Sequence, residues 1–591
     1  MTYNAPIQDM EFVLNELCGL EDVLSLPGNE DTTTDLVAAV LEEAARVANE
    51  VLAPLNRQGD TQGSRFEDGS VVTPDGWKAA YDAFVEGGWP SMTFDEEHGG
   101  QNLPYLVGTA VQEMVAASNM SFGLCPMLTQ GAVEALSRHG SDELKRLYLD
   151  KMVSGEWTGT MDLTEPQAGS DLSAVRTRAE PAGDHYRLYG QKIYITYGDH
   201  DLTDNIVHMV LARTPDAPEG VKGISLFLVP KFNVNPDGSI GERNDVHCVS
   251  IEHKLGIHGS PTCVLAYGDS GGATGYLVGE ENQGLVYMFI MMNLARHAVG
   301  VEGLAIADRA YQQALSFAKD RVQGRPVGVK SGDRVSIIHH PDVRRMLMTM
   351  KCKIEAMRAL VYSWSAAFDH SVCNPDQAER ERQQHFLDLL TPVVKGWCTE
   401  TGNSVAYMGV QVHGGMGFIE ETGAAQHLRD ARITTIYEGT TGIQAGDLVG
   451  RKLLRDGGAA AGEAVSRMRK IEAAASKIPE FVKSYGPAVD DLERATTWLL
   501  EVAMDEPQLP AAASGYYLEL WGIVTGGWLM ARSAIAARSK LDSGEADAGF
   551  YDAKIKTASY YAAHVLPGSS ALRHAIVEGS DEAMALEVEN F

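Results

Sequence analysis

The feature that most constrains the fold of this 591-residue chain is a change of texture near residue 157 and again near residue 280. Between these points, short runs rich in β-branched and aromatic residues alternate with Gly, Pro and Asp, as in 185–198, 206–213 and 262–268. This alternation predicts an antiparallel sheet. On both sides of it the apolar residues recur every three or four positions, which predicts long helices.

Helical, β and helical stretches in that order predict an α+β fold with segregated elements rather than alternating βαβ units. Pro54 is expected to end the first long helix, and the small residues 456–464 are expected to form a linker. The expected parts are a lead-in helix, a helical domain, an antiparallel β domain, a helical bundle and a helical extension, at residues 1–34, 35–158, 159–280, 281–455 and 456–591.

Charge and composition argue against several classes of function. The chain has 49 Lys and Arg against 80 Asp and Glu, a net charge of −31, which disfavours a general nucleic-acid-binding face. No Lys or Arg precedes Arg46, which argues against a signal peptide, and the apolar stretch 285–292 is too short to span a bilayer. The seven scattered cysteines predict reduced thiols and a cytoplasmic protein. We find no metal-ligand spacing, so no metal is expected.

Two segments have compositions that suit chemistry. In 161–180, Thr164, Gly169 and Ser170 could bind an anion or a flat polar ring, or could form only a turn between two elements. In 429–447, Glu438 precedes a predicted helix start at Thr440 or Thr441. Its carboxylate could cap that helix, or could act as a general base if an apolar pocket raises its pKa.

Two loops leave similar alternatives open. The glycines of QVHGGMGF at 411–418 could let the backbone approach a ligand closely or could form a tight turn between helices. The cations of RVQGRP at 321–326 end a long helix, where the helix dipole favours them without any ligand.

Read together, five motifs resemble the acyl-CoA dehydrogenase family in their order and spacing over about residues 35–455: TEPQAGSD (164–171), KIYITYG (192–198), RVQGRP, QVHGGMGF and IYEGTTGIQ (436–444). The resemblance implies an N-terminal helical domain, a middle antiparallel β domain and a C-terminal four-helix bundle, here with an additional helical extension. It also implies bound FAD and oxidation of an acyl-CoA thioester to its trans-2-enoyl-CoA. A carboxylate would remove the α-proton while the β-hydride passes to flavin N5.

The same resemblance assigns roles to residues of this chain. Glu438 matches the catalytic base, and the alternative family position for a base, near 291–300, contains no Asp or Glu. Arg321 and Gln323 match residues that reach the FAD of a neighbouring subunit, which implies a homodimer. The implied FAD-binding residues are Met161, Leu163, Thr164, Gly169, Ser170, Tyr194, Thr196, Arg321, Gln323, Gln411, Gly415 and Thr440. The implied substrate-binding residues are Arg296, Asn293, Tyr437 and Gly439, with Lys254 as a further candidate cation for CoA.

The segment after residue 455 resembles a long bacterial branch of the family. This implies 3-methylmercaptopropionyl-CoA as the substrate, methylthioacryloyl-CoA as the product and an electron-transfer flavoprotein as the electron acceptor. A medium- or long-chain fatty acyl-CoA is the alternative substrate, because a sulfur for a methylene changes binding by only about 1–3 kcal/mol. An oxidase stays open as an alternative. A DNA-associated alkylation-response flavoprotein is disfavoured, because 451–591 has 15 Lys and Arg against 20 Asp and Glu.

Overall fold

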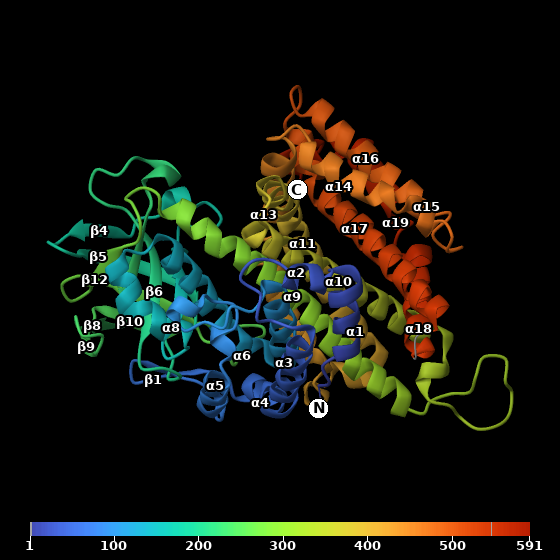
Figure 1. Ribbon diagram of the computed structural model, residues 1–591, viewed down its shortest axis with the longest axis horizontal. Helices are drawn as coiled ribbons and strands as arrows, with labels where there is room; N and C mark the ends of the chain where they lie inside the picture. The colour runs from blue at the N-terminus through green and yellow to red at the C-terminus, as the bar shows by residue number, and fades with distance from the viewer. Residues whose placement is uncertain (1–2, 545–546) are drawn as a thin grey trace. The chain divides into compact units, whose positions relative to one another are not determined.

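The computed structural model describes residues 3–544 and 547–591, and the fold is α+β (Figure 1). The chain forms two compact units. The first, here called the sheet unit, comprises mainly Glu43–Leu103 and Met114–Ala298. The second, the helical unit, comprises Ala5–Glu42, Pro104–Glu113 and Val299–Phe591.

The sheet unit is built on an eight-stranded sheet of order β10-β11-β5-β12-β7-β6-β3, with β4 paired to β5. Every residue of β6 and β7 is buried, so these two strands carry much of the core of the unit. Two short hairpins, β1–β2 and β8–β9, lie outside the sheet. The strands are β1 Arg65–Glu67, β2 Ser70–Val72, β3 Thr158–Asp162, β4 Arg178–Pro181, β5 Tyr186–Thr196, β6 Ile206–Ala212, β7 Ser225–Pro230, β8 Phe232–Val234, β9 Ile240–Arg243, β10 Val246–Ile251, β11 Thr262–Tyr267 and β12 Ala273–Leu277.

The prediction of an antiparallel sheet is confirmed for every pair of strands in it except one. β3 and β6 run parallel, from the pair Thr158–Ile206 to the pair Asp162–Val210. A parallel pair needs a long crossover, and the segment between these strands supplies one, since it contains β4 and β5. All five residues of β3 are buried, as is typical of parallel strands covered on both faces.

The expected helix end at Pro54 is wrong. Helix α3 (Thr34–Val47) passes into a π-helical turn at Ala48–Leu52, and α4 (Ala53–Gln62) follows directly, with Pro54 in its first turn. A proline is tolerated there because first-turn amides lack helical acceptors, and the π turn shifts the hydrogen-bond register just before it. The sheet unit also contains α5 Trp77–Glu86, most of α6 Tyr105–His139, α7 Asp142–Leu144 and α8 Asp150–Val153.

The helical unit is a bundle of long helices with an extension packed on it. In the extension, α17 packs on α10 and α11, and the indole of Trp397 fills the place where a Cβ on Gly522 would lie, only 2.0 Å away. The helices are α1 Ile7–Phe12, α2 Leu20–Leu24, α9 Gly284–Asp320, α10 Pro341–Cys373, α11 Gln377–His413, α12 Ala424–Ala431, α13 Thr441–Asp447, α14 Ala459–Lys470, α15 Glu472–Ala475, α16 Tyr485–Val502, α17 Gln508–Ser543, α18 Ala548–His564 and α19 Gly568–Val577.

The expected linker at 456–464 is shorter than predicted. Helix α14 begins at Ala459, so only residues 456–458 connect it to the π-helical turn before it. The carboxylate of Asp456 accepts from the backbone N–H groups of Gly458 and Ala460, both at 2.9 Å. The alanines that suggested a linker are strong helix formers, which explains the difference.

Helix α9 is long and apolar enough to cross a membrane by length and composition alone. However, 59% of its most apolar window is buried inside the protein, as expected for a core helix. Its first residues belong to the sheet unit and the rest, from Val299, to the helical unit.

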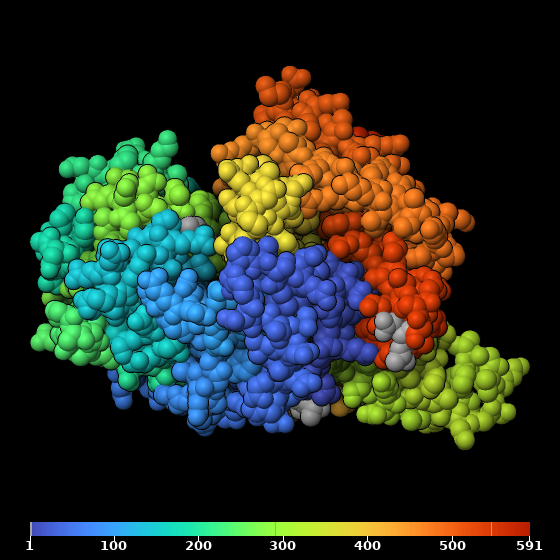
Figure 2. All heavy atoms as spheres, viewed as in Figure 1, coloured from blue at the N-terminus to red at the C-terminus, as the bar shows by residue number. Residues whose placement is uncertain are grey.

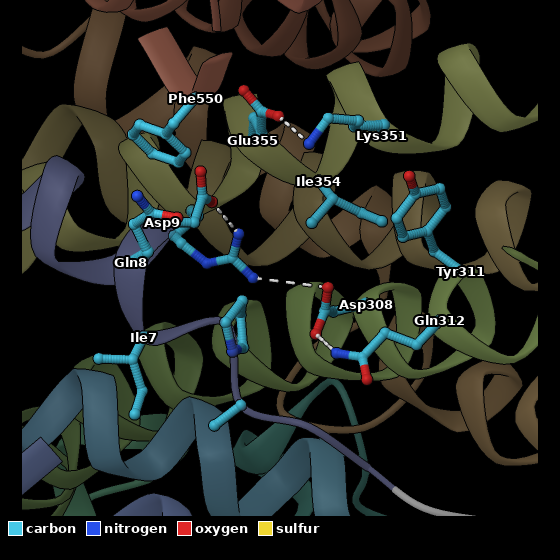
Figure 3. Close-up of a pocket in the computed structure, with 13 residues that line it drawn as sticks. Ile7, Gln8, Asp9, Asp308, Tyr311, Gln312, Lys351, Ile354, Glu355 and Phe550 are labelled. Carbon is cyan, nitrogen blue, oxygen red and sulfur yellow. Dashed lines mark hydrogen bonds and ion pairs between the residues drawn. The ribbon is translucent and has the colours of Figure 1, made fainter. Parts of the chain in front are cut away.

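A cavity of about 430 Å³ lies in the helical unit between the lead-in α1 and the helices α9, α10 and α18 (Figure 3). Its walls contain part of a buried ion cluster centred on Arg358, here called the Arg358 cluster. Arg358 pairs with Glu113 at 2.6 Å and also with Asp9, which in turn pairs with Lys554. The cluster therefore ties the lead-in, the bundle and the extension of this unit together.

Candidate active site

The loop that follows β3 in the sheet unit is pinned to strand β5 by a buried ion pair. The Glu165 carboxylate accepts from the Lys192 ammonium at 2.8 Å and from the Thr177 hydroxyl at 2.6 Å. Burial by itself raises the pKa of Glu165, but Lys192 and the hydrogen bonds outweigh burial and lower it to about 2. Glu165 is thus an ionised anchor, which the sequence motifs contained but to which sequence reasoning assigned no role.

This anchor brings predicted flavin residues of the loop and of β5 together. The Lys192 ammonium donates to the Leu163 carbonyl at 3.0 Å, and the Ile193 N–H donates to the Thr164 carbonyl at 2.9 Å. Thr196 pairs with Thr262 a short way along the same strand. Leu163, Thr164, Tyr194 and Thr196 therefore occupy one region of the sheet unit.

Tyr194 is presented by a bulge in β5. The register between β11 and β5 shifts between Cys263 and Leu265, which leaves an extra residue on the β5 side. Tyr194 has a left-handed backbone with φ of 60°, and its side chain is 60% exposed. A large aromatic ring held in a rare conformation and left open is what stacking on a flat ring requires.

The remaining flavin candidates of this unit flank that region. Met161 lies buried on β3, one residue before its end, whereas Gly169 and Ser170 are exposed on the loop. Nothing lies within 4 Å of the position of a Cβ on Gly169, so the loop backbone has open space beside it. Backbone amides with such space fit the donor set that a nucleotide cofactor needs.

The predicted substrate residues on α9 belong to the sheet unit. Arg296 is only 4% exposed, and Asn293 is partly buried. The nearby side chain of Tyr287 stacks on His139 of α6, with ring centroids 4.1 Å apart. Lys254 is partly buried, and its ammonium donates to the Ser260 carbonyl of its own loop at 2.9 Å.

In the helical unit, Glu438 lies in a left-handed turn between a 3-10 helix (Arg432–Thr435) and α13. Its φ is 55°, and Gly439 follows with φ of 90°. A non-glycine residue adopts this conformation at a cost of about 1–2 kcal/mol. The Gln444 side-chain amide donates to the carbonyls of both Glu438 and Gly439, at 3.1 and 3.3 Å.

The capping alternative for Glu438 is resolved by the structure. The Thr440 hydroxyl accepts from the Ile443 N–H at 3.3 Å, so Thr440 is the N-cap of α13, one of the two predicted helix starts. The carboxylate of Glu438 is therefore left for another role.

Sequence reasoning missed Glu302, a buried carboxyl on α9 that is 4% exposed. It accepts a hydrogen bond from the Tyr437 hydroxyl, next in the chain to Glu438. Burial raises its pKa to about 8, against the opposing effects of Tyr437 and Lys395. A signal existed, because Glu302 is the one acidic residue in the apolar run 297–307.

The other predicted flavin residues lie on exposed parts of the helical unit. Arg321 and Gln323 begin the loop 321–340, which projects from the helices of this unit (lime green in Figures 1 and 2). Gln411 and Gly415 are exposed where α11 ends, beside Phe418, whose side chain is 87% exposed. Among the described residues, no group of His, Cys, Asp and Glu is suited to a metal ion.

Four family profiles match successive segments of the chain. They are the N-terminal, middle and C-terminal domains of acyl-CoA dehydrogenase, at residues 34–156, 160–270 and 282–454, and an acetyl-CoA dehydrogenase C-terminal-like domain at 464–587. These profiles cover the sheet, the bundle and the extension.

Among curated proteins, 3-methylmercaptopropionyl-CoA dehydrogenase from Ruegeria pomeroyi is 50% identical over 99% of both chains. A butyryl-CoA dehydrogenase from Syntrophomonas wolfei is 36% identical over 96% of this chain and 95% of its own. Among solved structures, ACDH-11 of Caenorhabditis elegans in complex with C11-CoA shares the fold, with a TM-score of 0.77 and 21% identity over 98% of this chain and 96% of that one. The chain belongs to the acyl-CoA dehydrogenase family.

Proposed function

We propose that this acyl-CoA dehydrogenase oxidises 3-methylmercaptopropionyl-CoA to methylthioacryloyl-CoA, with Glu438 as the base that removes the α-proton. The observation that carries the proposal is the strained turn at Glu438, which Gln444 and Thr440 hold in place while the carboxylate caps no helix. The half-identical relative from Ruegeria pomeroyi, matched over 99% of both chains, supports the choice of substrate.

The sheet unit fits the FAD that the family uses. Tyr194 offers an exposed ring for stacking, and the loop at Leu163, Thr164, Gly169 and Ser170 offers polar groups and open space. The helical unit would add Arg321, Gln323, Gln411, Gly415 and Thr440. When bound, FAD would accept the β-hydride of the substrate.

The residues of the chain would supply the proton chemistry and the positioning. Glu438 would take the α-proton, and the backbone N–H in its turn would donate to the thioester oxygen, where negative charge develops. Arg296, Asn293, Tyr437 and Gly439 would hold the substrate. Lys254 is a weaker candidate for CoA, because its ammonium already donates to Ser260.

A panel of acyl-CoA substrates tests the proposed specificity. The expected result is the highest kcat/KM with 3-methylmercaptopropionyl-CoA, and butyryl-CoA within roughly 10–200-fold of it, because sulfur and methylene differ little in a hydrophobic pocket. A higher kcat/KM with a straight chain would instead favour a butyryl-CoA or fatty acyl-CoA dehydrogenase, the second candidate function, which the 36% identical relative supports.

We also propose a homodimer, with an electron-transfer flavoprotein as acceptor and no binding to nucleic acid. Exposed Arg321 and Gln323, together with the exposed apolar side chain of Phe418, offer a surface for a second copy. All seven cysteines are free thiols, which supports a cytoplasmic location. Sedimentation of the holoenzyme and of R321A tests the dimer, and peroxide release during turnover tests the oxidase alternative.

A further inference from the structure

We infer that Glu302 is a positioning residue for the base: through a buried hydrogen bond it holds Tyr437, and with it the turn that carries Glu438. This inference rests on the proposed function of Glu438. It goes beyond the family motifs, because Glu302 lies on α9, far from IYEGTTGIQ in the chain.

The turn is held from several sides within the helical unit. Before Glu438, the Tyr437 N–H donates to the Ile433 carbonyl at 3.1 Å and the Tyr437 hydroxyl donates to Glu302. After it, Gln444 takes the two carbonyls of the turn. Tyr437 is thus fixed at both its backbone and its hydroxyl, and Glu302 is the partner that fixes the hydroxyl.

The surroundings of Glu302 make its charge state matter for the base. Lys395, wholly buried on α11, faces it as a cation, and Tyr437 and Glu438 face it from the turn. Burial keeps Glu302 largely protonated at neutral pH, since its pKa is about 8. Glu438 can then be the ionised member of the pair, because two facing carboxylates ionise in coupled steps.

Ionisation of Glu302 would place a second negative charge beside the base. The substrate develops negative charge on its thioester oxygen as the α-proton leaves, so this second charge would oppose the reaction. The wild-type kcat is therefore expected to fall at pH values above about 8. A purely structural acid in the core would leave no such mark on the pH profile.

Two variants separate positioning from charge. In E302Q the side-chain oxygen still accepts from Tyr437, so we expect retained flavin, near-normal kcat at pH 7 and loss of the alkaline fall. In E302A the hydroxyl of Tyr437 loses its partner, and a loosened base is expected to lower kcat roughly 10–100-fold with little change in flavin content. Y437F is expected to resemble E302A, and the double variant E302A/Y437F to be no worse than either.

An infrared pH titration of the substrate-free holoenzyme supplies a readout that does not depend on turnover. Wild type minus E302Q is expected to show a protonated-carboxyl band that disappears near pH 8. Wild-type kcat and pH profile in E302A, or no such band, would overturn the inference. If instead E438Q keeps full turnover, the proposed function fails, whereas the infrared titration still reports on Glu302.

Discussion

Two groups of buried carboxyls in the helical unit differ in what faces them. In the Arg358 cluster, Glu113 lies 2.6 Å from the Arg358 guanidinium, and Glu355 lies 3.1 Å from the Lys554 ammonium. Asp9 lies between those two cations, which hold its pKa well below the ordinary range despite its burial. In the group at the base, here called the base turn, Glu302 faces a tyrosine, another carboxyl and one lysine, and its pKa rises to about 8.

The difference shows that the partner, more than burial, decides what a carboxyl can do. A carboxylate with close cations stays ionised and acts as a structural link. One whose burial is not compensated keeps a proton near neutral pH, which is typical of functional sites. Asp308 lies between the two cases: it is 3.7 Å from Arg358, and burial raises its pKa to about 6.

Removing the proposed base tests one side of the comparison with the largest expected effect. In E438Q the α-proton loses its acceptor, so kcat should fall by about 10²–10⁴-fold. Flavin absorbance and Tm should stay close to those of the wild type, because no ion pair is lost. Activity within a few-fold of wild type would remove Glu438 from the mechanism.

Removing the central cation tests the other side. R358L leaves the carboxylates of Glu113 and Asp9 buried without their guanidinium, which should cost about 3–5 kcal/mol of unfolding free energy. Denaturant unfolding monitored by circular dichroism measures this loss. E438Q serves as the matched control, and equal stability of the two variants would contradict the structural role of the cluster.

The two groups should also give stability opposite pH dependences. The pKa of Asp9 is lower in the folded state, so its contribution is present above about pH 4, the ordinary value for Asp, and is lost as the pH falls below that. The pKa of Glu302 is raised to about 8, so the folded state binds the extra proton and stability falls as the pH rises from about 4 to 8.

Comparing variants with wild type isolates each contribution. From pH 6 to pH 9, E302Q should gain on the order of 2 kcal/mol of unfolding free energy relative to wild type. D9N should weaken the acid sensitivity instead. Denaturant melts at several pH values measure both, and parallel curves for E302Q and wild type would argue that Glu302 is not protonated in the fold.

The smallest expected effect concerns the backbone of the base turn. Gly439 has φ of 90°, and a Cβ there would lie 2.8 Å from the Gln444 amide nitrogen, so G439A should cost about 1–2 kcal/mol and lower kcat. Gly442, inside α13, has only the Thr440 hydroxyl within 4 Å of such a Cβ, at 3.8 Å. G442A is therefore the control and should be neutral or slightly stabilising, by about 0.5–1 kcal/mol. Equal Tm and kcat for the two variants would mean that the left-handed turn is not required.

Local patterns predicted those features that depend on neighbours in the chain. The β texture between 157 and 280, the helix start at Thr440 and the long apolar helices all follow from periodicity and capping. The parallel pairing of β3 with β6 and the continuation through Pro54 were missed. Both depend on hydrogen-bond registers set by distant strands or by a π turn, which no local pattern encodes.

By itself the sequence determined the order of the elements, the family and the position of the proposed base, because motifs and periodicity lie along the chain. Only the tertiary structure decided which carboxyl keeps a proton, since that depends on the groups packed around it. Glu302 meets Tyr437 across 135 residues of chain, and Asp9 meets Lys554 across 545. Burial raises the pKa of one, and close cations lower the pKa of the other.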